Sequence, residues 1–177
     1  MDDALLIAQI LDLLGSHSYS GSALEQLLGE CVKVSRERRY FGRSYGYRHE
    51  WRPVLREGYG QYVVSNWGCV RIAAKSAERI LRPSLEHEYA RAPMSAAHRK
   101  GGSQHMIHEL VIESFILGYP IPKELRETKK VGDKIINHLD GDKWHPALHN
   151  LEITDQCQNM AHAYATGLRQ PRKSYGT

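Results

Sequence analysis

The stretch IINHLDGDKWHPALHNLEITDQCQNMAHA, residues 135–163, decides how this sequence is interpreted. It holds four His, three Asn and three Asp, side chains that can bind metal ions or move protons. The apolar start at 134–137 predicts a strand that ends at His138. A loop follows, and residues 151–154 predict a second short strand. Thr154 is expected to cap a helix that Gly167 ends.

The spacing of the polar residues sorts them into two pairs. Asn137 and His138 are adjacent at a strand end, so their side chains point to opposite faces. Asn159 and His162 are three apart on the predicted helix, so they share a face. If the helix packs across the two strands, one residue of the first pair can meet the second pair. Asn and His together with phosphate oxygens can hold a divalent metal, which is how Mg²⁺ commonly binds.

Charge is unevenly distributed along the chain of 177 residues, whose net charge is +4. Residues 1–30 contain five acidic residues and no Lys or Arg, whereas 31–56 contain eight basic residues and two Glu. A basic stripe of this kind suggests contact with phosphate. A solvated charge run is an equally good interpretation. The stripe consists of Lys33, Arg36, Arg38, Arg39, Arg43, Arg48, Arg52 and Arg56.

Within this stripe, residues 36–52 interleave Arg with Tyr and Phe. We interpret the segment as a linker or arm. Such an arm can follow a nucleic-acid backbone and stack on bases, or it can be a solvated connector.

The N-terminal region predicts two helices joined by a loop. Residues 3–14 are apolar around almost the whole helix, which therefore needs burial against this chain or a second copy. Ser22 and Glu25 form a capping box before a second helix at 23–34. A helix-turn-helix is an alternative, but the acidic first half would repel phosphate. The favoured interpretation is a hairpin that either packs against this chain or forms a homodimer contact with a second copy.

The cysteines and the N-terminal residues indicate the cellular compartment in which the protein is expected. Cys31, Cys69 and Cys157 are far apart and form no CxxC pair, so reduced thiols are expected. The N-terminal apolar run is too short to span a bilayer, and its acidic start is wrong for a signal peptide. We expect a soluble protein of the cytoplasm, without membrane contact.

The middle of the chain alternates short strands with one helix. Turn residues 65–68 separate two strand-like runs, and Gly101 and Gly102 indicate the turn of a further hairpin. The remaining expectations are a short strand at 79–83, a helix at 108–120 and a polar connector at 121–133.

These residues resemble the HNH nucleases, in particular the homing-endonuclease-like proteins of phages and introns. The resemblance covers about 51–168 and rests on Asn-His-x-Asp-Gly-Asp at 137–142, Asn-Leu-Glu at 150–152 and the helix with Asn159. Upstream, the sequence is similar to the small β module that commonly precedes HNH units. Glu109 stands where relatives usually have Arg. The matching positions of the β module are Trp51, Pro53, Gly58, Tyr59, Tyr62, Val64, Ser65, Asn66, Gly68 and Val70.

The resemblance implies a role for each matching residue. His138 takes the position of the general base, and Asn150 that of the residue that braces the loop. Asn137, where many relatives have Asp, and Asn159 take the positions of metal ligands. His162 stands where many relatives have a His that binds metal or phosphate. The implied cofactor is one divalent ion, Mg²⁺ or Mn²⁺.

The expected fold is α+β: an N-terminal helical hairpin, a small antiparallel β module and a ββα-metal HNH unit. The expected divisions are 1–48, 49–102, 103–168 and a basic tail at 169–177. The implied function is metal-dependent hydrolysis of double-stranded DNA by a phage or intron homing enzyme. The alternatives are a DNA-binding phage protein of the same fold with little or no cleavage activity and a structural or partner-binding phage protein. Expected DNA contacts are Arg36, Arg38, Arg39, Arg43, Arg48, Arg71 and Lys143.

Overall fold

The computed structural model describes residues 21–42, 47–73, 80–98, 101–128 and 130–169. The predicted helix at 3–14 lies outside these residues, as does the homodimer contact expected from it. Within the described ranges, no helix is both long and apolar enough to cross a membrane.

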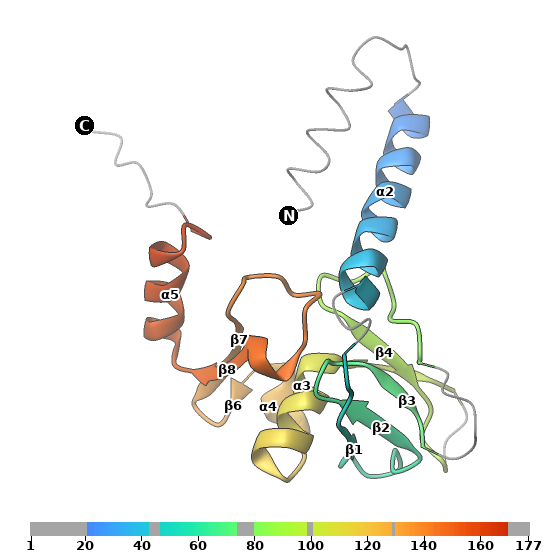
Figure 1. Cartoon of the computed structure of the whole chain (residues 1–177), viewed down its shortest axis with the longest axis vertical. Helices are drawn as coiled ribbons and strands as arrows, with labels where there is room; N and C mark the ends of the chain where they lie inside the picture. Colours follow the sequence, from blue (N-terminus) through green and yellow to red (C-terminus); the bar gives the residue numbers. More distant parts are fainter. Residues whose placement is uncertain (1–20, 43–46, 74–79, 99–100, 129, 170–177) are drawn as a thin grey trace.

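Helix α2, Gly21–Gly42, is the long helix that projects from the rest of the molecule in Figure 1. It confirms the helix predicted at 23–34 but continues for eight further residues, so the prediction of a linker from residue 36 is wrong. Residues 35–41 contain neither Gly nor Pro, and Arg and Glu favour helix. Tertiary contact fixes this end of the helix, because Tyr40 is buried and its hydroxyl donates to the Gly68 carbonyl at 2.7 Å.

The β module is an antiparallel sheet of β1 (Trp51–Pro53), β2 (Tyr62–Ser65) and β3 (Val70–Ile72). The predicted turn between β2 and β3 is confirmed: the Ser65 hydroxyl accepts hydrogen bonds from the backbone amides of Trp67 and Cys69. Gly68 has φ +77°, and a Cβ there would lie 2.6 Å from Pro146 in the HNH unit. The strand predicted at 79–83 is reduced, in the described residues, to one bridge between Ile80 and Arg71.

A hairpin of β4 (Arg91–Met94) and β5 (Ser103–Met106) leads directly into α3 (Ile107–Ile112). The boundary expected between residues 102 and 103 falls inside this hairpin. The helix predicted from residue 108 is present as α3 followed by a π-helical turn, Glu113–Leu117, which ends at Gly118 with φ +75°.

The expected HNH unit contains a second three-stranded antiparallel sheet in the order β6 (Lys130–Val131), β7 (Lys134–His138) and β8 (Leu151–Thr154). The segment 121–133, predicted to be only a connector, contains β6 and the short helix α4 (Lys123–Glu127). A 3-10 turn, Leu148–Asn150, precedes β8, and helix α5 (Gln156–Ala165) follows it. The cap of α5 is Asp155 rather than Thr154, because the Asp155 carboxylate accepts from the Gln158 amide at 2.7 Å.

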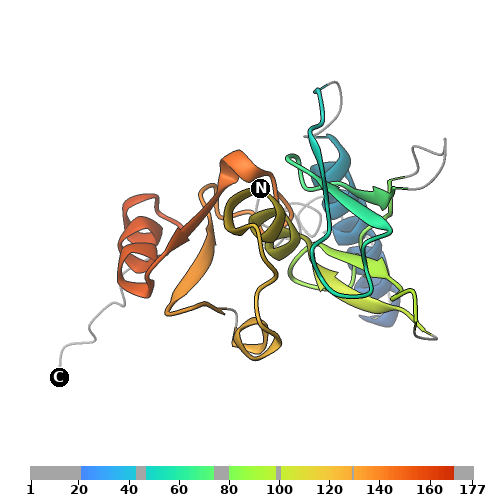
Figure 2. The ribbon, with the colours of Figure 1, turned by 90° about the horizontal axis from the view of Figure 1, so that it is seen from below.

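Helix α3 lies between the β module and the HNH sheet in both views (Figure 1, Figure 2). All six of its residues are buried. The four apolar residues of the helix pack in one continuous cluster with Val64 and Val70 of the β module and with Trp144 and Leu151 of the HNH unit. The two parts therefore share a core, and the sheet β6-β7-β8 is held in place by residues from the β module.

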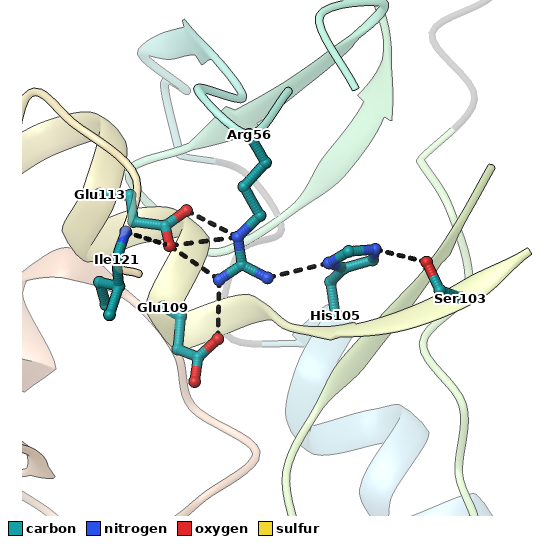
Figure 3. A network of polar contacts seen from close by, with 6 residues as sticks. All are labelled: Arg56, Ser103, His105, Glu109, Glu113 and Ile121. Atoms are coloured by element: carbon teal, nitrogen blue, oxygen red, sulfur yellow. Dashed lines mark hydrogen bonds and ion pairs between the residues drawn. The ribbon is translucent and has the colours of Figure 1, made fainter. Parts of the chain in front are cut away.

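A buried ionic network stabilises this junction (Figure 3). The guanidinium of Arg56 donates to both carboxylate oxygens of Glu113 and, at 2.7 Å, to Glu109 on the same helix. Arg56 is 6% exposed and Glu113 is 0% exposed. Glu113 also accepts from the Ile121 amide at 2.9 Å. Charges that are buried this deeply require an oppositely charged partner. Arg56 is the counter-charge of Glu109, the residue that stands where an Arg was expected from the resemblance.

The same guanidinium fixes the tautomer of His105. Because Arg56 can only donate, Nδ1 of His105 accepts at 2.9 Å, and its Nε2 carries the proton toward Ser103 Oγ at 2.7 Å. Burial, with the charges of Arg56 and Arg126, lowers the pKa of His105 to about 4. His105 is therefore neutral in the folded protein at pH 7.

This arrangement predicts that acid weakens the junction. Since the folded pKa of His105 lies below its ordinary value near 6.5, the unfolded chain binds more protons between these values. The free energy of unfolding should therefore fall as pH drops from about 6.5 to about 4. Urea unfolding at pH 7 and pH 5 measures this, with His105→Gln as the non-titrating variant. Gln can accept from Arg56 and donate to Ser103, so this variant should lose less stability at pH 5. An equal loss in both proteins would contradict the assignment.

Candidate active site

A pocket of about 260 Å³ opens between the HNH strands and α5. Asn137 and His138 reach it from the end of β7, and Asn159 reaches it from the helix. The sequence predicted that only one of Asn137 and His138 would meet the helical pair, whereas both line this pocket, because both lie at the strand end where the pocket opens. The full lining is Tyr89, Ile135, Ile136, Asn137, His138, Gly141, Lys143 and Asn159.

His138 combines burial with an unused nitrogen. The residue is 5% exposed, and its Nε2 makes no hydrogen bond within the described part of the chain. Burial lowers the pKa of His138 to about 4, against the opposing effect of the Asp140 and Asp142 carboxylates. Its ring packs edge-on against His108 at 5.1 Å between centroids. An imidazole that is neutral at pH 7 keeps one ring nitrogen unprotonated, which is the group that a general base requires.

Asn137 is held by a residue that the sequence interpretation overlooked. Its Nδ2 donates to Glu152 Oε1 at 2.8 Å, and the two residues are register partners in the β7–β8 ladder. The ladder register was the available signal: once His138 is paired with Leu151, Asn137 must pair with Glu152.

Asn150 and His162 have different positions from the pocket residues, and neither lines the pocket. Asn150 is buried, and its side chain binds the Asp140 amide at 3.1 Å, the Asp140 carboxylate at 2.9 Å and the His145 carbonyl at 2.9 Å. The Asp140 carboxylate also contacts Nδ1 of His145 at 2.7 Å. This is the geometry of a loop brace. His162 lies one turn beyond Asn159 on α5, and its role as a ligand remains a prediction.

The expected DNA contacts fall into two groups. Lys143 lines the pocket, forms an ion pair with Glu88 and lies 5.0 Å from the Tyr89 ring centroid. Arg48 is exposed, and Arg71 lies 4.4 Å from the centroid of the Trp51 ring. These three remain candidate contacts; Arg43 and the side chains of Arg38 and Arg39 lie outside the described residues.

Arg36 has a structural role instead. Its guanidinium donates to the backbone carbonyls of Leu85 at 2.8 Å and His87 at 3.2 Å and lies 5.5 Å from the centroid of the Trp144 ring. These contacts join α2 to the loop before β4 and to the HNH loop. We therefore leave Arg36 out of the proposed DNA surface.

Comparison with known proteins finds HNH endonucleases that are similar to parts of this chain. No family model matches the sequence. Over 78 residues, or 43% of this chain, the sequence is 36% identical to a Bacillus subtilis protein whose name is "SPbeta prophage-derived putative HNH homing endonuclease YosQ". Over 118 residues, 67% of this chain, it is 27% identical to an uncharacterized HNH endonuclease of Acanthamoeba polyphaga mimivirus. Over these parts of its length, the chain is similar to HNH endonucleases. It spans 39% and 27% of the lengths of these two relatives.

The fold of the chain is also similar to a solved structure. The HNH homing endonuclease I-HmuI matches with a TM-score of 0.52 over 71% of this chain and 63% of I-HmuI, at 23% identity. This likeness confirms the α+β architecture expected for an HNH chain. The pocket at Asn137, His138 and Asn159 lies within the region that carries the HNH motif.

Proposed function

We propose that this chain is a metal-dependent DNA endonuclease of the homing type. The observation that carries the proposal is the convergence of His138, Asn137 and Asn159 on one pocket. The relatives support the substrate: one is named as a homing endonuclease, and the I-HmuI structure is titled for DNA binding and cleavage. A prophage-derived relative further supports a phage or mobile-element origin, with action in the host cytoplasm.

The donors in the pocket are compatible with a hard divalent ion. No group of three or more His, Cys, Asp or Glu is arranged to hold a metal among the residues described. The amide oxygens of Asn137 and Asn159 are nevertheless hard donors, and the pocket leaves room for water and phosphate oxygens. Mg²⁺ and Mn²⁺ are commonly held by few protein ligands completed by substrate phosphate. Such an ion would neutralise charge that develops on the phosphate and the leaving oxygen.

The chain's own residues perform the remaining steps. His138, neutral at pH 7, takes the proton from the attacking water at its free nitrogen. The hydrogen bonds of Asn150 hold the loop that follows His138, which fixes the imidazole relative to the pocket. Lys143 provides a positive charge at the pocket rim for a neighbouring phosphate of the DNA backbone.

Removing the metal tests the proposal. Supercoiled plasmid, including DNA from a related phage, is incubated with the protein and Mg²⁺ or Mn²⁺, with EDTA in a parallel sample. We expect nicked or linear product with either ion and none with EDTA. Cleavage that persists in EDTA would contradict metal dependence. Specific DNA binding without cleavage under any condition would instead favour the second candidate, a DNA-binding relative in which Asn137 replaces the stronger ligand Asp.

DNA affinity should fall steeply with salt, since binding of cationic side chains releases counterions. Replacing a phosphate-contacting residue, Arg48→Ala or Lys143→Ala, should reduce the slope of log K against log salt by about one. Fluorescence anisotropy with labelled duplex DNA measures this slope. Lys123→Ala is the control, because Lys123 lines neither the pocket nor the proposed DNA surface. Equal slopes for all four proteins would remove Arg48 and Lys143 from the surface.

A further inference from the structure

Glu152 lies beside the proposed metal ligand but does not line the pocket itself. Its Oε1 accepts from Asn137 Nδ2 at 2.8 Å across the β7–β8 ladder. Both side chains are partly buried. Glu152 can therefore affect a bound ion through Asn137.

The chemistry of this contact determines which end of the Asn137 amide faces the pocket. An ionised carboxylate only accepts hydrogen bonds, so the NH₂ group must face Glu152. The reversed amide would place its oxygen against the carboxylate, with repulsion in place of a charge-assisted hydrogen bond. Only the amide oxygen can bind a cation. Without Glu152, Asn137 is free to present its NH₂ group, which repels a cation.

We infer that Glu152 is a positioning residue that holds the Asn137 oxygen toward the pocket and thereby sets the affinity for a divalent cation. The inference rests on the proposed function, because it assumes that Asn137 is a ligand. It also accounts for an Asn where many relatives have Asp. An Asp presents oxygens at both ends and needs no partner to orient it. The Asn137–Glu152 pair has the same total charge as one Asp but requires the second residue.

The test is a double-mutant cycle that measures Mn²⁺ affinity of the full chain by electron paramagnetic resonance. In the natural background, Glu152→Ala should weaken Mn²⁺ binding about tenfold, as loss of a residue that orients a ligand typically does. In the Asn137→Asp background, Glu152→Ala should leave the affinity unchanged or make it tighter. If Glu152 acted only through its charge, its removal would weaken binding in both backgrounds, and this result would overturn the inference.

A purely structural role gives a different result. Urea unfolding without metal shows whether each variant folds. A Glu152→Ala protein that is less stable but binds Mn²⁺ with natural affinity would overturn the inference. Glu152→Gln is the second variant if alanine prevents folding. Gln can pair with either end of the Asn137 amide, so Glu152→Gln should weaken Mn²⁺ binding less than Glu152→Ala does. Natural Mn²⁺ affinity in the Glu152→Gln protein would also overturn the inference.

Asn137→Ala separates this inference from the proposed function. If Asn137→Ala weakens Mn²⁺ binding and Glu152→Ala does not, the positioning role fails and the metal site stands. If Asn137→Ala leaves Mn²⁺ affinity and DNA cleavage unchanged, the metal site itself is wrong.

Discussion

Replacing His138 with alanine is expected to reduce the rate of metal-dependent DNA cleavage by about 10²- to 10⁴-fold, the usual contribution of a general base. His138 is the pocket residue with a buried ring nitrogen that makes no hydrogen bond in the described chain, and burial keeps its imidazole neutral at pH 7. Among the residues that the structure describes, no other imidazole lines the pocket to take a proton from the attacking water. Single-turnover cleavage of plasmid DNA with saturating protein measures the chemical step.

His149→Ala is the matched control for this experiment. His149 belongs to the same motif-rich loop but is exposed and packs edge-on against Trp67, away from the pocket lining. The His149→Ala protein should cleave plasmid DNA at a rate within a few-fold of that of the natural protein. The DNA affinity of both variants, measured in Ca²⁺, should remain near the natural value. Cleavage by His138→Ala at the rate of His149→Ala would remove His138 as the base.

Replacing Arg56 with methionine is expected to lower the free energy of unfolding by about 3–5 kcal/mol, the cost of breaking a buried ion pair. The change removes the counter-charge of Glu109 and Glu113, which are 5% and 0% exposed. It also removes the donor that His105 Nδ1 accepts from. Because this network joins the β module to α3, the loss should affect the whole core. Urea unfolding followed by tryptophan fluorescence measures the change.

Lys123→Met is the control for charge removal as such. Lys123 pairs with Glu127 at 3.9 Å on the surface, where both side chains are well exposed. Surface pairs of this kind contribute about 1 kcal/mol or less. If Arg56→Met is as stable as Lys123→Met, the buried network does not hold the junction. Adding Glu109→Gln and Glu113→Gln to Arg56→Met should recover part of the loss, because the uncompensated charges are then gone.

The site was predictable from the sequence to the extent that local spacing fixes geometry. The strand–loop–strand–helix order was enough to bring one residue of Asn137 and His138 toward the helical pair, but adjacency on a strand did not predict that both would line the pocket. The same reasoning did not determine which helical residue would reach the pocket, since the rotation of α5 depends on its packing. Asn159 reaches the pocket, and His162 does not line it.

The errors have a common cause in contacts that are distant in sequence. The end of α2 is set by the contact between Tyr40 and Gly68. The basic and aromatic composition of residues 36–52 does not reveal this contact, and it led to the wrong prediction of an arm from residue 36. Arg56 was counted in a basic stripe, although Glu109 and Glu113 more than fifty residues away neutralise it. Glu152 was overlooked because its importance depends on strand register. The Thr154 cap was a smaller error, since Asp155 next to it is an equally good capping residue.

Anomalous diffraction from Mn²⁺ in crystals of the chain bound to uncleaved DNA tests the central claim most directly. We predict one Mn²⁺ peak in the pocket, bonded to the side-chain oxygens of Asn137 and Asn159 and to a phosphate oxygen, with His138 facing the same phosphate. A DNA complex with the phosphate in place but no Mn²⁺ at Asn137 and Asn159, or with Mn²⁺ held elsewhere, would contradict the account.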